Sequence, residues 1–238
     1  MKNEEILLPY FNELKRLKDN NEFIIDKTGV KTVEIINCNI KGLNPEQWYL
    51  EFPGRKSPIK YIEKEMKWYN SLSLNIKGYV DDIKIWQQVC DKDGNVNSNY
   101  GWCIYSKDNY QQYDNSLLEL IKNKDSRRAC MIYNRPSMWE DYKNNGMNEF
   151  ICTFATQQFI RNNKLIYIIY QRSADSIFGA LFIDFAWHCE VYMKLYNDLK
   201  KNYKDLQIGQ IDFNFGSLHV YERHFEMLDK ICTYEVKK

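Results

Sequence analysis

Apolar residues recur every three or four positions in several stretches, which is the spacing of an amphipathic helix. This pattern predicts helices over residues 3–19, 57–72, 107–123 and 182–201. Because proline disrupts a helix interior, we expect Pro9 in the opening turn of the first helix or at a displaced start. Ser57 and Pro58 have the residue types of an N-cap and a first turn, and they open the second helix. The buried stripe of the second helix is expected to comprise Ile59, Ile62, Met66 and Tyr69.

Runs rich in Val, Ile, Tyr and Phe predict strands in the remaining chain. They lie at residues 22–37 with a turn at Gly29, and at 128–133, 149–160, 164–171, 207–215 and 217–225. Residues 161–164 are expected to join two of these strands as an antiparallel hairpin. The mixture predicts an α+β fold, with one mixed sheet and helices packed mainly on one of its faces. No repeat or linker interrupts the chain, so we expect a single domain over residues 1–238.

Composition narrows the classes of protein that fit. The 33 basic and 32 acidic residues give a net charge of +1, which argues against a general nucleic-acid binder. Seven cysteines without a CxxC pair indicate free thiols in a reducing compartment. The first residues do not have the pattern of a secretory signal, and no apolar run approaches the roughly 20 residues that span a bilayer. We therefore expect a soluble cytoplasmic protein with no membrane partner.

The strand predicted at residues 164–171 ends in polar groups that folding alone does not require. Arg172, Ser173 and Asp175 follow it directly. Strand ends of this kind often hold anions in proteins that contain helices and sheets. The adjacent Arg127 and Arg128 offer planar, permanently charged groups for a phosphate, although two arginines alone also fit a solvated surface.

Two further positions have both a structural and a chemical interpretation. Cys152 in an apolar stretch fits a core residue, or a nucleophile if a cation such as Arg172 lowers its pKa. His219 and Tyr221 lie two apart on a strand, so they share a face and could hold a polar ligand or simply pack. Three scattered histidines do not predict a zinc site, and no phosphate-binding glycine motif is present.

A series of motifs from Phe23 to His224 resembles the thymidylate synthase superfamily. In chain order they are "DKTG" (26–29), "EMKW" (65–68), "IWQQV" (85–89), "NYGW" (99–102), "DSRR" (125–128), Cys152, "YQRSAD" (170–175) and "HVY" (219–221). The resemblance implies the fold of that family, with one face of the sheet forming the interface of a homodimer. It also implies a pyrimidine nucleoside monophosphate as substrate and 5,10-methylenetetrahydrofolate as cofactor.

The resemblance assigns a role to each candidate residue. Cys152 would attack C6 of the pyrimidine as a thiolate, so that C5 takes the one-carbon unit, with Glu65 as the acid/base group. Without the resemblance, Glu65 would be interpreted as a solvated helix residue. Asp175 would face the pterin and take part in catalysis. The remaining roles are phosphate binding by Lys27, Arg172 and Ser173, sugar binding by His219 and Tyr221, cofactor binding by Trp86 and Tyr100, and phosphate binding across the dimer by Arg127 and Arg128.

Several stretches are more similar to the deoxycytidylate 5-hydroxymethyltransferase branch of phages than to true synthases. These are "DKTGVKT", "NSNYGW", "MIYNRPSM" and "FGALFIDFAW". Synthases carry asparagine where the base is read, whereas this branch carries an aspartate that accepts the amine of cytosine; here it is Asp184. The resemblance therefore implies dCMP as substrate and 5-hydroxymethyl-dCMP as product. A thymidylate synthase, a hydroxymethylase acting on dUMP or CMP, and an inactive nucleotide- or RNA-binding relative remain alternatives.

The chain departs from the family pattern in four places. One extra residue lies between Gly179 and Asp184, so that an ungapped comparison puts Ile183 at the reader position. Ile151 and Thr153 flank Cys152 where synthases have proline and histidine. Lys27 stands where synthases have arginine, and the C-terminal closing segment of synthases is not recognisable.

Overall fold

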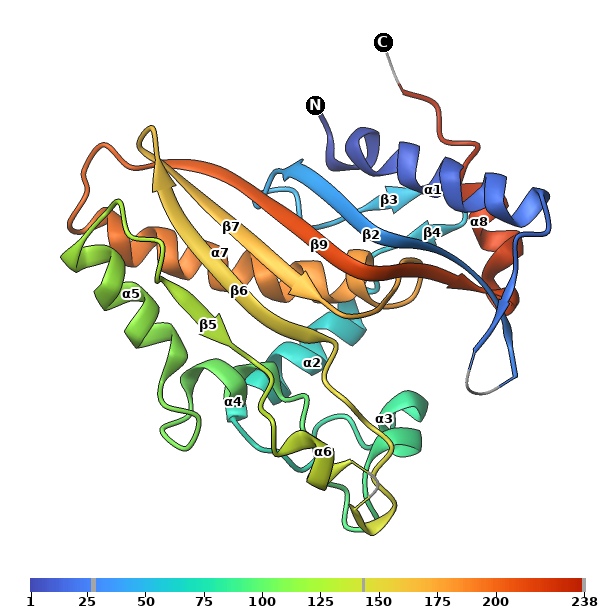
Figure 1. The fold of residues 1–238 in the computed structure, drawn as a ribbon, viewed down its shortest axis with the longest axis horizontal. Coiled ribbons are helices and arrows are strands. Elements are labelled where there is room, and N and C mark those ends of the chain that lie inside the picture. Colours follow the sequence, from blue (N-terminus) through green and yellow to red (C-terminus); the bar gives the residue numbers. More distant parts are fainter. Residues whose placement is uncertain (27–28, 143, 237–238) are drawn as a thin grey trace. The chain divides into compact units, whose positions relative to one another are not determined.

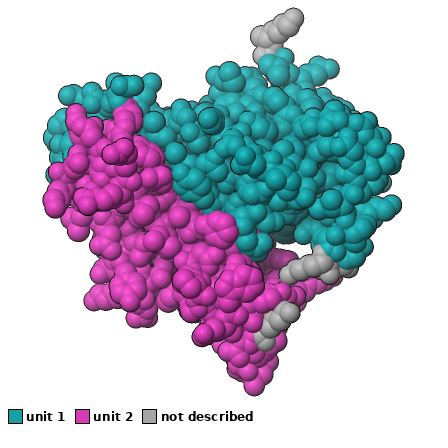
Figure 2. Space-filling model, in the orientation of Figure 1, with its two compact units in different colours: residues 1–58, 162–238 teal, residues 59–161 magenta. Residues whose placement is uncertain are grey.

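The computed structural model describes residues 1–26, 29–142 and 144–236. The chain divides into two compact units, one formed by Met1–Pro58 with Asn162–Lys238 and the other by Ile59–Arg161, which Figure 2 shows in different colours. The expectation of a single domain therefore stays a prediction. Within the described ranges, no helix is long and apolar enough to cross a membrane.

The first unit is built on a mixed sheet (Figure 1). Its strands are β1 (Ile24–Ile25), β2 (Lys31–Leu43), β9 (Gln207–Tyr221) and β7 (Lys164–Gln171), in that order, with β8 (Ala174–Asp175) also beside β9. Strand β2 pairs with β9 in the antiparallel sense, whereas β7 and β8 pair with it in the parallel sense. The predicted α+β class with a mixed sheet is confirmed.

Helices and short elements complete the core of this unit. They are α1 (Asn3–Asp19), the hairpin of β3 (Glu51–Phe52) and β4 (Arg55–Lys56), the π-helical turn η2 (Ala180–Asp184), α7 (Phe185–Lys200), the 3₁₀ turn η3 (Glu222–His224) and α8 (Phe225–Ile231). The ring of Phe11 on α1 lies 5.3 Å from that of Phe52 and 6.4 Å from that of Phe182. Helix α7 is held on the sheet by the Tyr192 hydroxyl, which donates to the Leu165 carbonyl at 2.8 Å.

The second unit is mostly helical. Its elements are α2 (Ile59–Ser71), α3 (Lys84–Val89), α4 (Tyr100–Tyr105), α5 (Gln112–Lys122), α6 (Met138–Asp141), the 3₁₀ turn η1 (Asn144–Gly146) and the antiparallel strands β5 (Cys130–Ile132) and β6 (Thr153–Arg161). Helices α2 and α4 approach very closely at Gly101, where an added Cβ would lie 1.9 Å from the Tyr69 carbonyl oxygen. Only glycine fits this crossing, which explains its place in the "NYGW" motif.

Five local predictions were wrong. The strand predicted at residues 149–160 begins only at Thr153, so residues 149–152 precede β6. Pro9 lies inside α1, where it costs the helix one backbone hydrogen bond. Ile59 is 46% exposed, because the buried face of α2 runs through Ile62, Glu65, Trp68 and Tyr69. Helix α5 begins only at residue 112, since Tyr110 and Gln111 have left-handed φ angles.

The fifth error concerns the end of the chain. Strand β9 continues through Gly216 without a break and stops at Tyr221, and residues 222–231 are helical rather than extended. The alternation of apolar residues ends at that point. Phe225, Leu228 and Ile231 instead follow at a spacing of three, and Leu228 and Ile231 are buried.

Candidate active site

Cys152 lies directly before β6 and is partly exposed, unlike the cysteines that serve the core. Cys38, Cys103 and Cys189 are buried, and burial raises the pKa of each thiol. A buried thiol with a raised pKa stays protonated and is a poor nucleophile. Of the two interpretations of Cys152, partial exposure favours the reactive one.

Glu65 is only 3% exposed, so it is not the solvated helix residue that its position alone would indicate. Two side chains donate to its Oε1: the Tyr61 hydroxyl at 2.6 Å, from one turn earlier in α2, and the Trp86 indole at 3.1 Å, from α3. The Trp86 ring also packs edge-on against Trp68, at 4.8 Å. The structure therefore brings Glu65 and Trp86 together, and it adds Tyr61, which sequence reasoning missed.

Tyr100 begins α4 and is buried against both α2 and the start of β6. Its ring stacks on Tyr69 at 5.4 Å, and its hydroxyl accepts a hydrogen bond from Thr153 at 3.0 Å. Tyr100 thus contacts the residue that follows Cys152. This neighbourhood connects the predicted nucleophile with the helix that carries Glu65.

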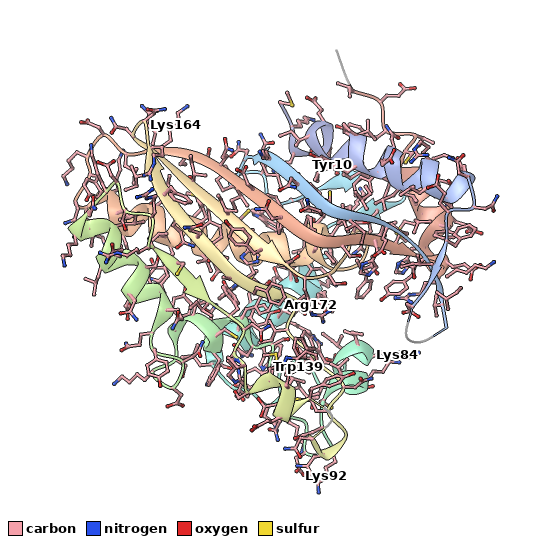
Figure 3. All side chains as sticks on the ribbon, viewed as in Figure 1. Tyr10, Lys84, Lys92, Trp139, Lys164 and Arg172 are labelled. Atoms are coloured by element: carbon pink, nitrogen blue, oxygen red, sulfur yellow. The ribbon has the colours of Figure 1, made fainter. Side chains whose placement is uncertain are left out.

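Arg172 and Ser173 follow β7 in the first unit, and Figure 3 labels Arg172 just past that strand. The backbone of β9 passes unusually close here, because an added Cβ at Gly216 would lie 2.6 Å from the Arg172 carbonyl oxygen. The same carbonyl accepts the Ser217 amide at 3.1 Å. The predicted end of the strand is therefore fixed against β9 by its backbone.

Asp175 is held as an anion by its surroundings. Its Oδ1 accepts the backbone amides of Ile177 and Phe178, both at 3.0 Å, and its Oδ2 lies 3.5 Å from Nδ1 of His224. Burial acts to raise its pKa, but the hydrogen bonds from His224 and from the Phe178 amide outweigh burial and hold that pKa below its ordinary value.

His219 and Tyr221 share a face of β9, as predicted. Their rings contact edge-on at 5.0 Å. His219 pairs with Asp175 in the register of β8 and β9, and it is 8% exposed. Burial lowers the pKa of His219 in spite of the nearby carboxylates of Asp175 and Glu34. Neutral imidazole is thus favoured, which both donates and accepts hydrogen bonds.

Asp184 ends the π-helical turn η2, where the amide of Phe185 donates to the carbonyl of Ala180. Such an i→i−5 bond encloses one residue more than an α-helical turn. The extra residue that the resemblance implies between Gly179 and Asp184 would lie in this turn. Ile183 is an apolar, buried neighbour, whereas the carboxylate of Asp184 accepts the Gln171 amide at 3.0 Å. Burial raises the pKa of Asp184 to about 6, against the smaller opposing effect of Gln171.

The adjacent arginines precede β5 in the second unit and are exposed. Arg128 forms an ion pair with Glu119 at 3.1 Å with its own side chain 79% exposed, a type of contact that contributes little to stability. The carbonyl of Arg127 accepts the Gln157 side chain at 2.9 Å. Their role across a dimer stays a prediction, and Lys27 lies outside the described residues.

Comparison with known proteins identifies the family. The sequence profile described as "Thymidylate synthase" matches residues 8–238. The chain belongs to the thymidylate synthase family. It is 45% identical to the "Deoxycytidylate 5-hydroxymethyltransferase" of Enterobacteria phage T4 and to that of Enterobacteria phage T2. In both comparisons the 211 matched residues cover 87% of this chain and 83% of the relative. It is 25% identical over 238 residues to a "Thymidylate synthase" of Francisella tularensis subsp. holarctica, and this match covers 95% of this chain and 84% of the relative.

The candidate residues of this thymidylate synthase family member fall into two groups, one in each unit. Those of the first unit are Arg172, Ser173, Asp175, Asp184, His219 and Tyr221, and those of the second are Glu65, Trp86, Tyr100, Arg127, Arg128 and Cys152. Sequence reasoning missed Gln171, although it stands inside the quoted "YQRSAD" motif. Its polar side chain at the end of an apolar strand was the available signal.

Proposed function

We propose that this protein is a deoxycytidylate 5-hydroxymethyltransferase that uses 5,10-methylenetetrahydrofolate. The observation that carries the proposal is its likeness to the phage enzymes of that name along most of both chains. A buried aspartate at residue 184, where the resemblance expects asparagine in a synthase, supports the same choice of base.

The chemistry at the pyrimidine would begin with the Cys152 thiolate. Its attack forms an S–C6 bond and moves the C5–C6 π pair to C5, which becomes the carbon nucleophile. Once C5 carries the new carbon, loss of the C5 proton would break the bond from that carbon to the cofactor nitrogen, which would leave with tetrahydrofolate. Water would then add to the exposed carbon, and departure of the thiolate would restore the ring. The net change is replacement of the C5 hydrogen by a hydroxymethyl group. The partial exposure of Cys152 is compatible with this role.

Glu65 is the group best suited to hold and deprotonate the attacking water. It is a buried carboxylate whose Oε1 is oriented by Tyr61 and Trp86. A fixed carboxylate in a low-dielectric environment is an effective general base when a water lies within hydrogen-bond reach. The same group could return the proton at a later step.

The side chains present fit a folate cofactor. The anionic Asp175 can accept the N–H groups of a pterin ring, and the half-buried Trp86 offers an aromatic surface. Methylenetetrahydrofolate supplies the one-carbon unit when bound. We assign Asp175, Trp86 and Tyr100 to hold it.

Selection of cytosine would depend on Asp184. Ionised, its carboxylate accepts the exocyclic amine; protonated, it also donates to N3. Uracil presents a carbonyl oxygen in place of the amine, and a carboxylate repels this oxygen. Gln171 fixes the orientation of the Asp184 side chain through its 3.0 Å hydrogen bond. The phosphate and sugar of the nucleotide are assigned to Arg172, Ser173, His219 and Tyr221, together with Lys27.

We also propose a twofold homodimer in which Arg127 and Arg128 reach the site of the other subunit. Exposed apolar side chains on the strands support an interface: Ile36 on β2 is 64% exposed and Phe154 on β6 is 43% exposed. Contiguous apolar patches on a protein surface often mark an interface with another chain.

The deciding experiment is to incubate the protein with dCMP, CMP or dUMP and methylenetetrahydrofolate and to weigh the products. We expect dCMP to gain a hydroxymethyl group. A methylated product would indicate a synthase instead, and no release of the C5 proton from dCMP would indicate a mere binder. Cys152→Ala should abolish turnover while nucleotide binding stays measurable. Substantial turnover by that variant would rule out the covalent mechanism.

A further inference from the structure

Glu149 is a buried carboxylate that the proposed chemistry does not use. It lies three residues before Cys152 and is 6% exposed. Its Oε2 accepts the backbone amide of Asn97 at 2.7 Å, and its Oε1 accepts the hydroxyl of Ser98. Burying a carboxylate is unfavourable unless such donors compensate for lost water. Its two bonds therefore fix the chain before Cys152 to residues 97 and 98.

The chain after Cys152 is attached to the same place. Thr153 is fully buried, and its hydroxyl donates to the Tyr100 hydroxyl at 3.0 Å. Residues on both sides of Cys152 thus bind one tetrapeptide, residues 97–100, which we call the NSNY segment after its sequence. Two attachments that flank a residue restrict its backbone more than either does alone.

The NSNY segment is in turn fixed to α2, which carries Glu65. Asn99 is fully buried and caps α4, since its Oδ1 accepts the Trp102 amide at 2.7 Å. Its Nδ2 donates to the carbonyl of Trp68 on α2 at 2.8 Å. Tyr100 stacks on Tyr69 of the same helix. A continuous set of contacts therefore leads from Cys152 to the helix of Glu65.

A second set of contacts holds Asn97 from outside. Nη2 of Arg135 donates to Oδ1 of Asn97 at 2.6 Å and also lies 2.9 Å from the Asp141 carboxylate. The side-chain nitrogen Nδ2 of Asn97 also lies 3.3 Å from the sulfur of Met147. These contacts hold the side chain of Asn97 in place. They thereby restrict the position of its backbone amide, which donates to Glu149.

We propose that Glu149 is a positioning residue, which acts through the NSNY segment to hold Cys152 at a fixed place relative to Glu65. The inference rests on the proposed function only in that Cys152 and Glu65 are the reacting groups. Covalent attack requires the reacting atoms to be placed within a fraction of an ångström, and a misplacement of about 1 Å costs about 100-fold in rate. A buried carboxylate with two donors is a rigid way to provide that placement.

The test compares Glu149→Ala, Glu149→Gln and Ser98→Ala with wild type. We expect Glu149→Ala to lower kcat about 10- to 100-fold, with the KM for dCMP within about threefold of wild type. Glu149→Gln keeps one acceptor oxygen, so its kcat should lie between those of wild type and Glu149→Ala. Ser98→Ala should lose activity that Ser98→Thr, which keeps the hydroxyl, regains. Glu63→Gln removes an exposed glutamate of α2 and is the matched control.

Alkylation of Cys152 as a function of pH, read by peptide mass spectrometry, gives a measurement independent of turnover. We expect the alkylation rate or its pH midpoint to change in Glu149→Ala and Ser98→Ala. Unchanged alkylation and unchanged kcat in folded Glu149→Ala would overturn the proposal. If that variant does not fold, the Ser98 variants replace it, and unchanged alkylation and kcat in Ser98→Ala would overturn the proposal. Failure of wild type to hydroxymethylate dCMP would contradict the proposed function, whereas the alkylation comparison would still test Glu149.

Discussion

Replacing Asp184 by asparagine should stabilise the protein, and the gain should depend on pH. Burial raises the pKa of Asp184 from 3.8 to about 6. Each pKa unit corresponds to about 1.4 kcal/mol, so the ionised carboxylate destabilises the folded state by about 3 kcal/mol at neutral pH. Asparagine has the same shape and can still accept the Gln171 amide, which donates to the aspartate at 3.0 Å. The variant therefore removes the charge and keeps the hydrogen bond.

The direction of the pH dependence follows from the raised folded-state pKa. Between about pH 4 and pH 6 the unfolded chain has released the proton of Asp184 while the folded chain retains it, so wild type loses stability as pH rises. The asparagine side chain does not titrate. The advantage of Asp184→Asn over wild type should be about 1.6 kcal/mol at pH 5 and about 3 kcal/mol at pH 7.5.

Urea unfolding at equal protein concentration and at both pH values measures this difference. Any effect of asparagine that does not depend on pH cancels between the two conditions. Asp205→Asn, at an exposed position, is the control and should change stability by less than about 0.5 kcal/mol at either pH. An equal stability difference at pH 5 and pH 7.5 would refute the reasoning.

The same variant tests the reading of the base. With Asp184→Asn, the ratio of kcat/KM for dCMP to that for dUMP should shift towards dUMP. A ratio that stays the same would show that Asp184 does not select the base. Stability and specificity are thus expected to change in opposite directions, because the buried charge that destabilises the fold is the one proposed to distinguish the bases.

Two further predictions concern the second unit. Gly101→Ala would place a Cβ 1.9 Å from the Tyr69 carbonyl oxygen, so we expect the free energy of unfolding to fall by about 3 kcal/mol or more. Thermal unfolding measures this loss. A melting temperature within about 2–3 °C of wild type, roughly 1 kcal/mol, would show that α2 and α4 can separate. If Arg127 and Arg128 act across a dimer, an equal mixture of Cys152→Ala chains with chains lacking both arginines should recover about one quarter of wild-type activity after subunit exchange. No recovery in exchanged mixtures would place all site residues in one chain.

The parts of the fold that the sequence predicted are those with a strong local period. Strand β7 matched its predicted range, and helix α7 differed mainly at its start, which lies at Phe185 after the π-helical turn; long apolar runs and regular spacing determine both elements. The segment 222–231 failed for the opposite reason. A single phenylalanine extended the strand pattern there, while the helical spacing of Leu228 and Ile231 became informative only with their burial.

The candidate site shows a similar division. Candidate residues such as Cys152 and Glu65 could be proposed from the sequence because the type and order of the motifs resemble those of a known family. Glu149 could not, since its bonds to Asn97 and Ser98 join residues about 50 positions apart. No local pattern reports such a pairing, because it arises only when the chain has folded and placed an acidic side chain beside a turn.

The π-helical turn at Ala180–Asp184 has a consequence for how the chain accommodates one residue more than an α-helical turn holds. An additional residue in a regular α-helix rotates everything beyond it by about 100°, which would turn the buried face of α7 towards solvent. A widened turn confines that rotation to one point, so the rest of the helix keeps its packing against the sheet. We therefore expect the core to tolerate the gain or loss of a single residue at this turn without a rebuilding of α7.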